Sequence, residues 1–106
     1  CVRDYVHITD ISEAHVLAVN YLLSHGDSHE INIGSGKGTS ILEIVNKVES
    51  ILSKKIKVRF VSRRLGDADR LVASIKKAKK ILNWMPKYSS LNNILQTAIS
   101  WHKRLK

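Results

Sequence analysis

The sequence has few of the residues that define several classes of protein. It contains one cysteine and one proline in 106 residues, and aromatic side chains make up only 6%. A single cysteine cannot form an internal disulfide, which fits a reducing compartment, so we expect a cytoplasmic protein. No apolar run reaches the roughly 18–20 residues of a membrane span, and nothing at the start resembles a signal peptide. We therefore expect neither a disulfide-stabilised secreted domain nor a membrane protein.

Methionine is also scarce, since Met85 is the only one and the chain opens at Cys1. A natural protein begins with methionine or a processed leader, so we expect a piece of a longer protein. The length of residues 1–106 is that of one domain. An apolar content of 43% and a charged content of 25% are typical of a folded chain and exclude disorder.

The net charge of +9 is concentrated in one part of the chain. Residues 1–53 carry a net charge of −4, residues 54–87 carry +10, and residues 88–106 carry +3. A basic segment of this kind suggests an anionic partner, which could be a nucleic acid, membrane headgroups or a phosphorylated small molecule.

Hydrophobic periodicity predicts an α/β domain with the element order βαβαβαα. Strands are expected over residues 2–8, 29–33 and 56–61, and helices over residues 11–24, 41–52, 74–82 and 91–105. Capping patterns place the helix starts at Asp10 or Ser12, at Ser40 with Glu43, and at Ser90.

The first predicted helix is apolar on two sides. Ala14 and Ala18 lie on one side, and Val16, Val19 and Leu23 lie on the other. A helix with two apolar sides requires cover on both, and a chain of this length does not supply it. We therefore expect further sequence in the natural protein, and self-association in its absence.

A glycine-rich turn, Gly34-x-Gly36-x-Gly38, follows a predicted strand and precedes a predicted helix. This layout is shared by phosphate-binding loops. Its spacing, however, is neither that of a dinucleotide-binding loop nor that of a Walker loop. The favoured interpretation is a tight turn whose glycines adopt positive φ.

A second candidate site combines basic residues from two distant segments. Arg3 and Tyr5 share one face of the first predicted strand, while Arg63, Arg64 and Asp67 lie in a loop with no apolar period. An arginine in such a loop is more often a solvated surface charge than a ligand of a bound molecule. The planar guanidinium group bonds two oxygens of a diphosphate at once and stays charged. A neighbouring carboxylate can accept hydrogen bonds from ribose hydroxyls.

Five motifs in order resemble the C-terminal part of the UDP-glucose 4-epimerase family, which belongs to the extended short-chain dehydrogenase/reductases. They are Arg3-Asp4-Tyr5-Val6-His7-Ile8-x-Asp10, Ile31-Asn32-Ile33-Gly34-Ser35-Gly36-x-Gly38-x-Ser40, Arg63-Arg64-x-Gly66-Asp67, Ala73-Ser74-x-x-Lys77-Ala78 and Leu82-x-Trp84. The resemblance implies a small substrate-binding portion without the Rossmann half that binds NAD. It implies that Arg3 and Arg64 contact the UDP diphosphate, that Tyr5 lies beside them, and that Asp67 bonds the ribose.

The resemblance also implies a function for the parent protein, the interconversion of UDP-galactose and UDP-glucose in galactose metabolism. The expected partners are a UDP-sugar, the missing N-terminal NAD-binding domain and other copies of the protein. The chain has no Tyr-x-x-x-Lys pair and no dinucleotide-binding loop, so we expect it alone to bind no NAD and to be catalytically inactive. No catalytic residue and no metal ligand is predicted, because the five histidines lack metal-binding spacing.

Two alternatives remain open. The basic segment could form a nucleic-acid-binding module, although its only aromatic residues, Phe60 and Trp84, are interpreted as core. The parent could also be a related epimerase or dehydratase acting on another UDP-sugar. Leu71 stands where some relatives carry a tyrosine near the sugar, which leaves the identity of the sugar open.

Overall fold

A small sheet lies at the centre of the computed structural model, which describes residues 1–105. The elements in that range are β1 (Val2–Asp4), α1 (Ile8–His25), β2 (Gly38–Ser40), α2 (Ile41–Leu52), β3 (Arg70–Leu71), α3 (Lys76–Leu82) and α4 (Leu91–Arg104). The mixed α/β class and the element order βαβαβαα agree with the prediction.

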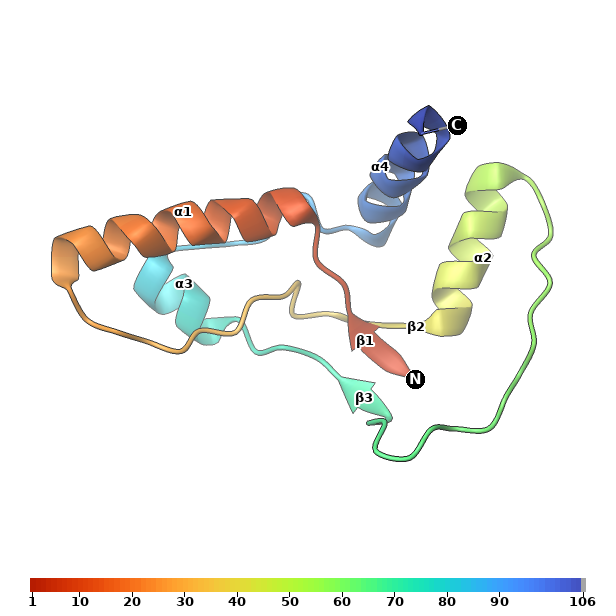
Figure 1. Cartoon of the computed structure of the whole chain (residues 1–106), viewed down its shortest axis with the longest axis horizontal. Helices are drawn as coiled ribbons and strands as arrows, with labels where there is room; N and C mark the ends of the chain where they lie inside the picture. The colour runs from red at the N-terminus through yellow and green to blue at the C-terminus, as the bar shows by residue number, and fades with distance from the viewer. Residues whose placement is uncertain (106) are drawn as a thin grey trace.

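The strand order in the sheet is β2-β1-β3, so the N-terminal strand is the central one (Figure 1). β1 pairs with β2 in antiparallel fashion, with Arg3 opposite Thr39, and with β3 in parallel fashion, with Arg3 opposite Leu71. Arg3 is therefore flanked by a strand on each side.

Two strands lie at positions other than those predicted. The segments 29–33 and 56–61 have no strand partner within the described residues, whereas the pairing segments are β2 and β3. β1 also ends at Asp4 and not at residue 8. Alternating β-branched residues give a segment the propensity to form a strand, but a strand exists only when another one hydrogen-bonds to it.

Phe60 is 80% exposed, so its assignment to the core is wrong.

Two of the predicted helix starts are confirmed. Ser40 and Glu43 form a reciprocal capping box at the start of α2, and the Ser90 side chain caps α4. Hydrogen bonds from the backbone and side chain of Ser40 lower the pKa of the Glu43 carboxyl. Local sequence is sufficient here because every capping group lies within three residues of its partner.

The start of α1 differs from the prediction. His7 occupies the N-cap position, and its Nδ1 accepts a hydrogen bond from the Thr9 backbone N–H at 3.0 Å. Its Nε2 lies 2.9 Å from the Thr97 hydroxyl of α4. Asp10, one of the predicted caps, lies inside the first turn, where its carboxylate is bound to another segment.

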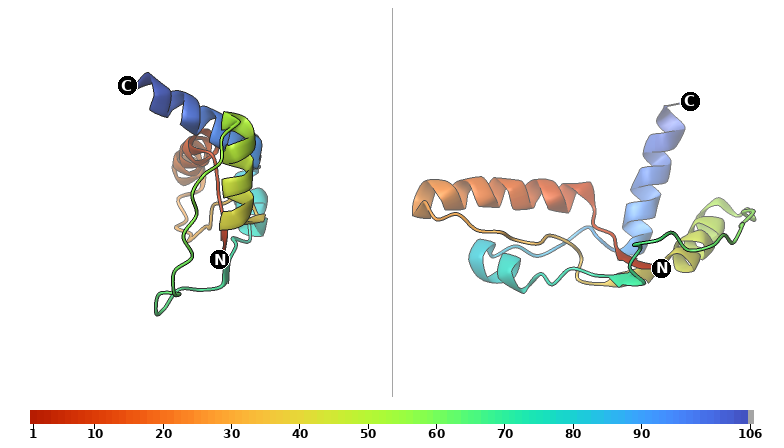
Figure 2. Two further views of the ribbon diagram at one scale, coloured as in Figure 1. Left: turned by 90° about the vertical axis from the view of Figure 1, so that its right-hand side faces the viewer. Right: turned by 60° about the horizontal axis from the view of Figure 1, so that its bottom comes forward.

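The buried core is small and lies between α1 and α3, with the segment after α3 running alongside (Figure 2). Its buried apolar residues are Ala14, Ala78, Leu82 and Trp84. Trp84 is fully buried, as predicted. The prediction of an inward face along the end of α4 is wrong, because Trp101 is 61% exposed.

The chain is extended for its length. Its radius of gyration is 16.7 Å, against about 13 Å for a compact domain of roughly 100 residues. On α1, the side opposite the core exposes Ile8, Val16, Val19 and Leu23, which we term the outer stripe. The prediction of a helix with two apolar sides is confirmed. Among residues 1–105, no helix is long and apolar enough to cross a membrane.

Candidate functional site

The loop of residues 63–69 is attached to β1, although the bonded residues Arg3 and Ala68 are 65 positions apart in sequence. The Val2 backbone N–H donates to the Asp69 carbonyl at 2.8 Å, and Arg3 Nη1 donates to the Ala68 carbonyl at 2.9 Å. The loop reaches the sheet just before β3 (Figure 1). The Arg3 side chain therefore contacts the loop that carries Arg64 and Asp67, two of the other predicted site residues.

Arg64 and Asp67 lie at the two ends of a turn within this loop. The Asp67 N–H donates to the Arg64 carbonyl at 3.3 Å, and Arg64 Nε donates to Asp67 Oδ2 at 3.2 Å. Gly66 adopts a φ of +85°, which a residue with a side chain rarely adopts. The Arg64 side chain is 86% exposed and the Asp67 side chain 29%. The structure thus brings the Arg3 guanidinium group to the loop of Arg64 and Asp67, where it donates to the carbonyl of Ala68, the residue after Asp67.

Tyr5 lies in a different setting. It lines a cavity of about 220 Å³ together with Lys37 of the glycine-rich turn, Glu43 of α2, and Ser90 and Ile94 at the start of α4. Arg3, Arg64 and Asp67 do not line this cavity. Of the four predicted residues, the structure therefore places Arg3, Arg64 and Asp67 at the contact between β1 and the 63–69 loop, and Tyr5 in the cavity.

The glycine-rich turn binds a carboxylate that belongs to the chain itself. The backbone N–H groups of Ser35 and Gly36 donate to Asp4 at 2.7 and 2.9 Å, and the Ser35 hydroxyl donates to it at 2.6 Å. Of the three glycines only Gly36 adopts a positive φ, +78°, so the predicted conformation is confirmed there and is wrong for Gly34 and Gly38. Sequence reasoning missed Asp4, although its position on the apolar face of a predicted strand was the available signal.

Asp10 is a second carboxylate that accepts hydrogen bonds from another segment of the same chain. It is fully buried and accepts hydrogen bonds from the N–H groups of Lys87 and Tyr88, each at 2.9 Å, and from the Ser89 hydroxyl. Burial acts to raise the pKa of Asp10, but these hydrogen bonds and the nearby His7 lower it further than burial raises it. Asp10 thus fixes the start of α1 to the segment that precedes α4.

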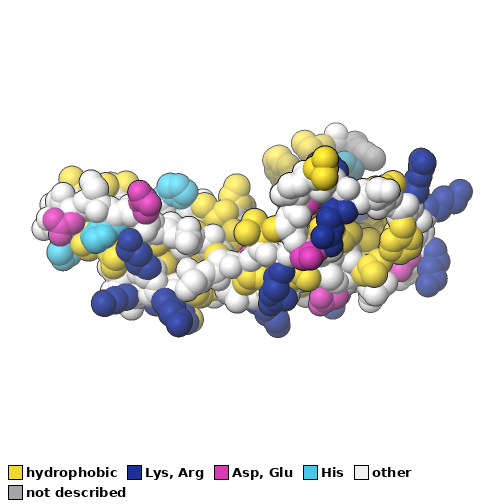
Figure 3. Space-filling model, turned by 90° about the horizontal axis from the view of Figure 1, so that it is seen from below, with side chains coloured by type: hydrophobic (Ala, Val, Ile, Leu, Met, Phe, Trp, Pro, Cys, Tyr) yellow, Lys and Arg dark blue, Asp and Glu magenta, His cyan; other side chains and the backbone are white. Residues whose placement is uncertain are grey.

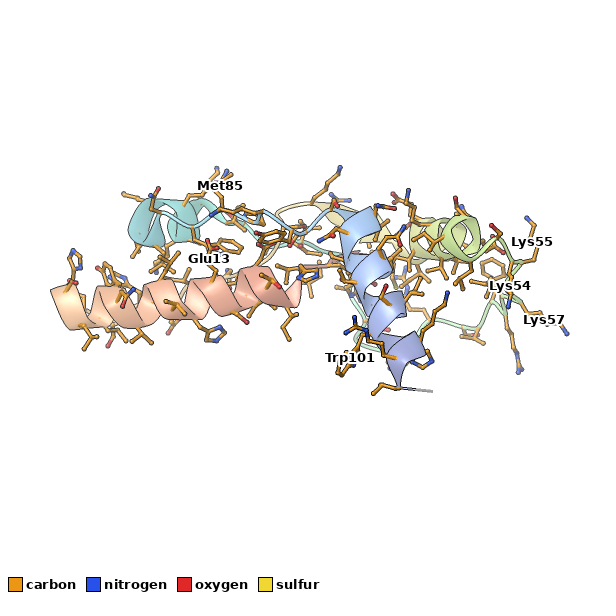
Figure 4. The ribbon with its side chains drawn as sticks, turned by 90° about the horizontal axis from the view of Figure 1, so that it is seen from above. Glu13, Lys54, Lys55, Lys57, Met85 and Trp101 are labelled. Atoms are coloured by element: carbon orange, nitrogen blue, oxygen red, sulfur yellow. The ribbon has the colours of Figure 1, made fainter. Side chains whose placement is uncertain are left out.

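The basic side chains do not form one surface. Seen from below, they lie in separate groups along the molecule (Figure 3). Lys54, Lys55 and Lys57 project at the end beyond α2 (Figure 4). Toward the opposite end of the molecule, Glu13 of α1 faces the segment after α3. Lys87 Nζ in that segment lies 3.6 Å from the Glu13 carboxylate. The charge concentrated in the sequence is therefore dispersed in space.

The chain belongs to the GDP-mannose 4,6-dehydratase family, whose model matches residues 1–97. Its relatives include UDP-glucose 4-epimerases. The chain is 42% identical over 104 residues to the UDP-glucose 4-epimerase of Rhizobium leguminosarum bv. trifolii, a match that covers 98% of this chain and 32% of the relative.

Solved structures agree with the sequence comparison. The UDP-glucose 4-epimerase of Stenotrophomonas maltophila, with bound NAD and formylated UDP-arabinopyranose, superposes with a TM-score of 0.92 at 32% identity, covering 98% of this chain and 31% of that one. The Brucella ovis enzyme in complex with NAD gives 0.85 at 40% identity, covering 92% and 30%. The chain matches the C-terminal part of such epimerases and spans about a third of their length.

Proposed function

We propose that this chain is the UDP-sugar-binding C-terminal part of a cytoplasmic UDP-glucose 4-epimerase that interconverts UDP-galactose and UDP-glucose in galactose metabolism. In this proposal residues 1–106 form one substrate-binding unit. The observation that carries the proposal is the contact between Arg3 and the loop of Arg64 and Asp67. The similarity to UDP-glucose 4-epimerases over 98% of the chain supports it.

In the proposed site, Arg3 and Arg64 bind the diphosphate and Asp67 accepts hydrogen bonds from the ribose. A guanidinium group has five N–H donors. Arg3 uses only Nη1 in hydrogen bonds to residues 1–105, so its other nitrogens can bind a ligand. The Arg64 side chain is exposed, so the nitrogens of its guanidinium group can also bind a ligand. Tyr5, in the adjacent cavity, bounds the nucleotide on the side of α4.

We propose that NAD is held by another part of the parent enzyme. When bound, the nicotinamide takes up and returns a hydride, so the cofactor supplies the difficult step. The glycine-rich turn of this chain does not fit a dinucleotide, because the N–H groups of Ser35 and Gly36 are already bonded to Asp4. The chain's own contribution is to bind and orient the UDP group.

The UDP site is tested by titrating the isolated chain with UDP, uridine and inorganic phosphate, followed by amide NMR. We expect UDP to shift signals from β1 and the 63–69 loop, and to bind more tightly than uridine or phosphate. Arg3→Ala and Arg64→Ala should each weaken UDP binding at least about tenfold, since each removes charge-assisted hydrogen bonds worth about 1.5–3 kcal/mol.

Lys80→Ala is the matched control, because it removes one positive charge from the exposed side of α3. Unchanged UDP affinity in both arginine variants would refute the site. Binding of a mixed-sequence oligonucleotide more tightly than UDP, with a steep dependence on salt, would instead favour the nucleic-acid-binding alternative.

A further inference from the structure

We infer that Asp4 is a positioning residue for the UDP site, and that the glycine-rich turn is a carboxylate receptor which Asp4 fills from within. The inference rests on the proposed function for its link to UDP. The carboxylate receptor itself stands on hydrogen bonds and close contacts that are independent of that function.

Four hydrogen bonds converge on the Asp4 carboxylate from two other segments. Oδ1 accepts from the N–H and the hydroxyl of Ser35, at 2.7 and 2.6 Å. Oδ2 accepts from the Gly36 N–H at 2.9 Å and from the Ala73 N–H at 3.1 Å. Successive backbone N–H groups around one anion form the type of concavity that binds phosphate in other proteins. Here the anion comes from β1.

The turn fits closely around this carboxylate. A Cβ atom built on Gly34 would lie 2.6 Å from Asp4 Oδ2 and 2.8 Å from the Ala73 Cβ. Gly34 is itself buried. Glycine is required at this position because any side chain would displace either the carboxylate or the segment after β3.

Asp4 therefore links three segments at the point where Arg3 must be placed. Arg3 precedes Asp4 on the central strand, and Ala73 follows β3, which the 63–69 loop enters. Without the Asp4 carboxylate, the donors of the turn and of Ala73 would lose a shared acceptor. The register between β1 and β3, and with it the distance from Arg3 to the loop of Arg64, would then no longer be fixed.

Chemical rescue tests the receptor. Asp4→Ala removes the carboxylate and leaves the N–H donors with room for a small anion, for which formate is the probe. We expect the unfolding midpoint of the variant to fall by about 10 °C or more. Sodium formate should restore at least half of that loss, whereas sodium chloride at equal ionic strength should not.

Asp27→Ala is the matched control, since it makes the same change of charge at an exposed turn. Equal stabilisation of both variants by formate would overturn the inference, because it would show a general salt effect. In the second arm, Asp4→Ala should weaken UDP binding about tenfold or more, with recovery in formate, while Asp27→Ala should bind UDP like the unsubstituted chain. Normal UDP binding by a stable Asp4→Ala chain would overturn the positioning role.

Failure of the proposed function and failure of the inference about Asp4 give different results. If the unsubstituted chain binds no UDP, the proposed function fails while rescue of the unfolding midpoint still reports on the receptor. If Asp4→Ala does not fold, the unsubstituted chain is titrated with acid and followed by NMR. The Ser35, Gly36 and Ala73 amide signals should then shift together with the Asp4 side-chain carboxyl signal, and independent shifts would overturn the inference.

Discussion

Carboxylates bonded within the chain hold together segments that its small hydrophobic core does not reach. Asp4 fastens the glycine-rich turn and the segment after β3 to the central strand. Asp10 fastens the segment before α4 to the start of α1, and its backbone carbonyl also accepts a hydrogen bond from Trp84 Nε1 at 2.9 Å. Each carboxylate satisfies several backbone N–H groups at once, so its removal leaves several donors without a partner.

Asp10→Asn is expected to lower the free energy of unfolding by about 3 kcal/mol at neutral pH, because an amide nitrogen would replace a carboxylate oxygen among N–H and O–H donors. The pKa of Asp10 lies below its ordinary value of 3.8 in the folded chain. The stability from this group is therefore full above 3.8 and is lost as the pH falls through the folded-state pKa.

Urea unfolding at neutral and acidic pH measures both effects. The unsubstituted chain should lose stability on acidification more steeply than Asp10→Asn does. Asp27→Asn provides the control for a lost negative charge. A variant as stable as the unsubstituted chain at neutral pH would show that the hydrogen bonds to Asp10 contribute little.

At the scale of elements, α1 has one side that packs on α3 and another that the chain leaves open. Val16, Val19 and Leu23 of the outer stripe are each more than half exposed. Burial of apolar surface is worth about 25 cal/mol per Å², so such a side favours contact with other protein. We propose that the missing N-terminal part covers the outer stripe in the parent, and that a second copy covers it in the isolated chain.

Val19→Glu is therefore expected to reduce self-association of the isolated chain, because it places a charge in the middle of the outer stripe. Sedimentation velocity over a range of concentrations measures the shift toward monomer. Asn20→Glu adds the same charge at the neighbouring exposed position and should have a smaller effect. A strictly monomeric unsubstituted chain at high concentration would contradict this prediction.

At the scale of the whole molecule, the extended shape and the small core fit a chain that spans about a third of the length of its relatives. The segment 56–61 illustrates this, because its apolar side chains, Phe60 among them, are exposed and no described strand pairs with it. The same exposure is what a strand would show if its partner belonged to another part of the protein. This exposure fits the proposal that UDP binds to this chain while the hydride transfer takes place in another part of the parent protein.

The isolated chain is expected to have no epimerase activity, because its sequence has neither a Tyr-x-x-x-Lys pair nor the spacing of a dinucleotide-binding loop. A coupled assay that follows conversion of UDP-galactose to UDP-glucose, with NAD added, measures this. A full-length UDP-glucose 4-epimerase from one of the related organisms serves as the positive control. Turnover by the purified chain would contradict the proposal that the hydride transfer takes place in another part of the parent protein.

Local patterns along the chain were sufficient for the helices, for the caps at Ser40 and Ser90, and for the motifs that indicated the family, because each depends on residues close together in sequence. They also selected Arg3, Arg64 and Asp67. The fold brings the Arg3 side chain into contact with the loop of the other two, while the roles of these residues stay a prediction. Long-range contacts decided the rest. Which segments pair as strands, and which donors surround Asp4 and Asp10, depends on chain segments tens of residues away, and no local periodicity records such partners.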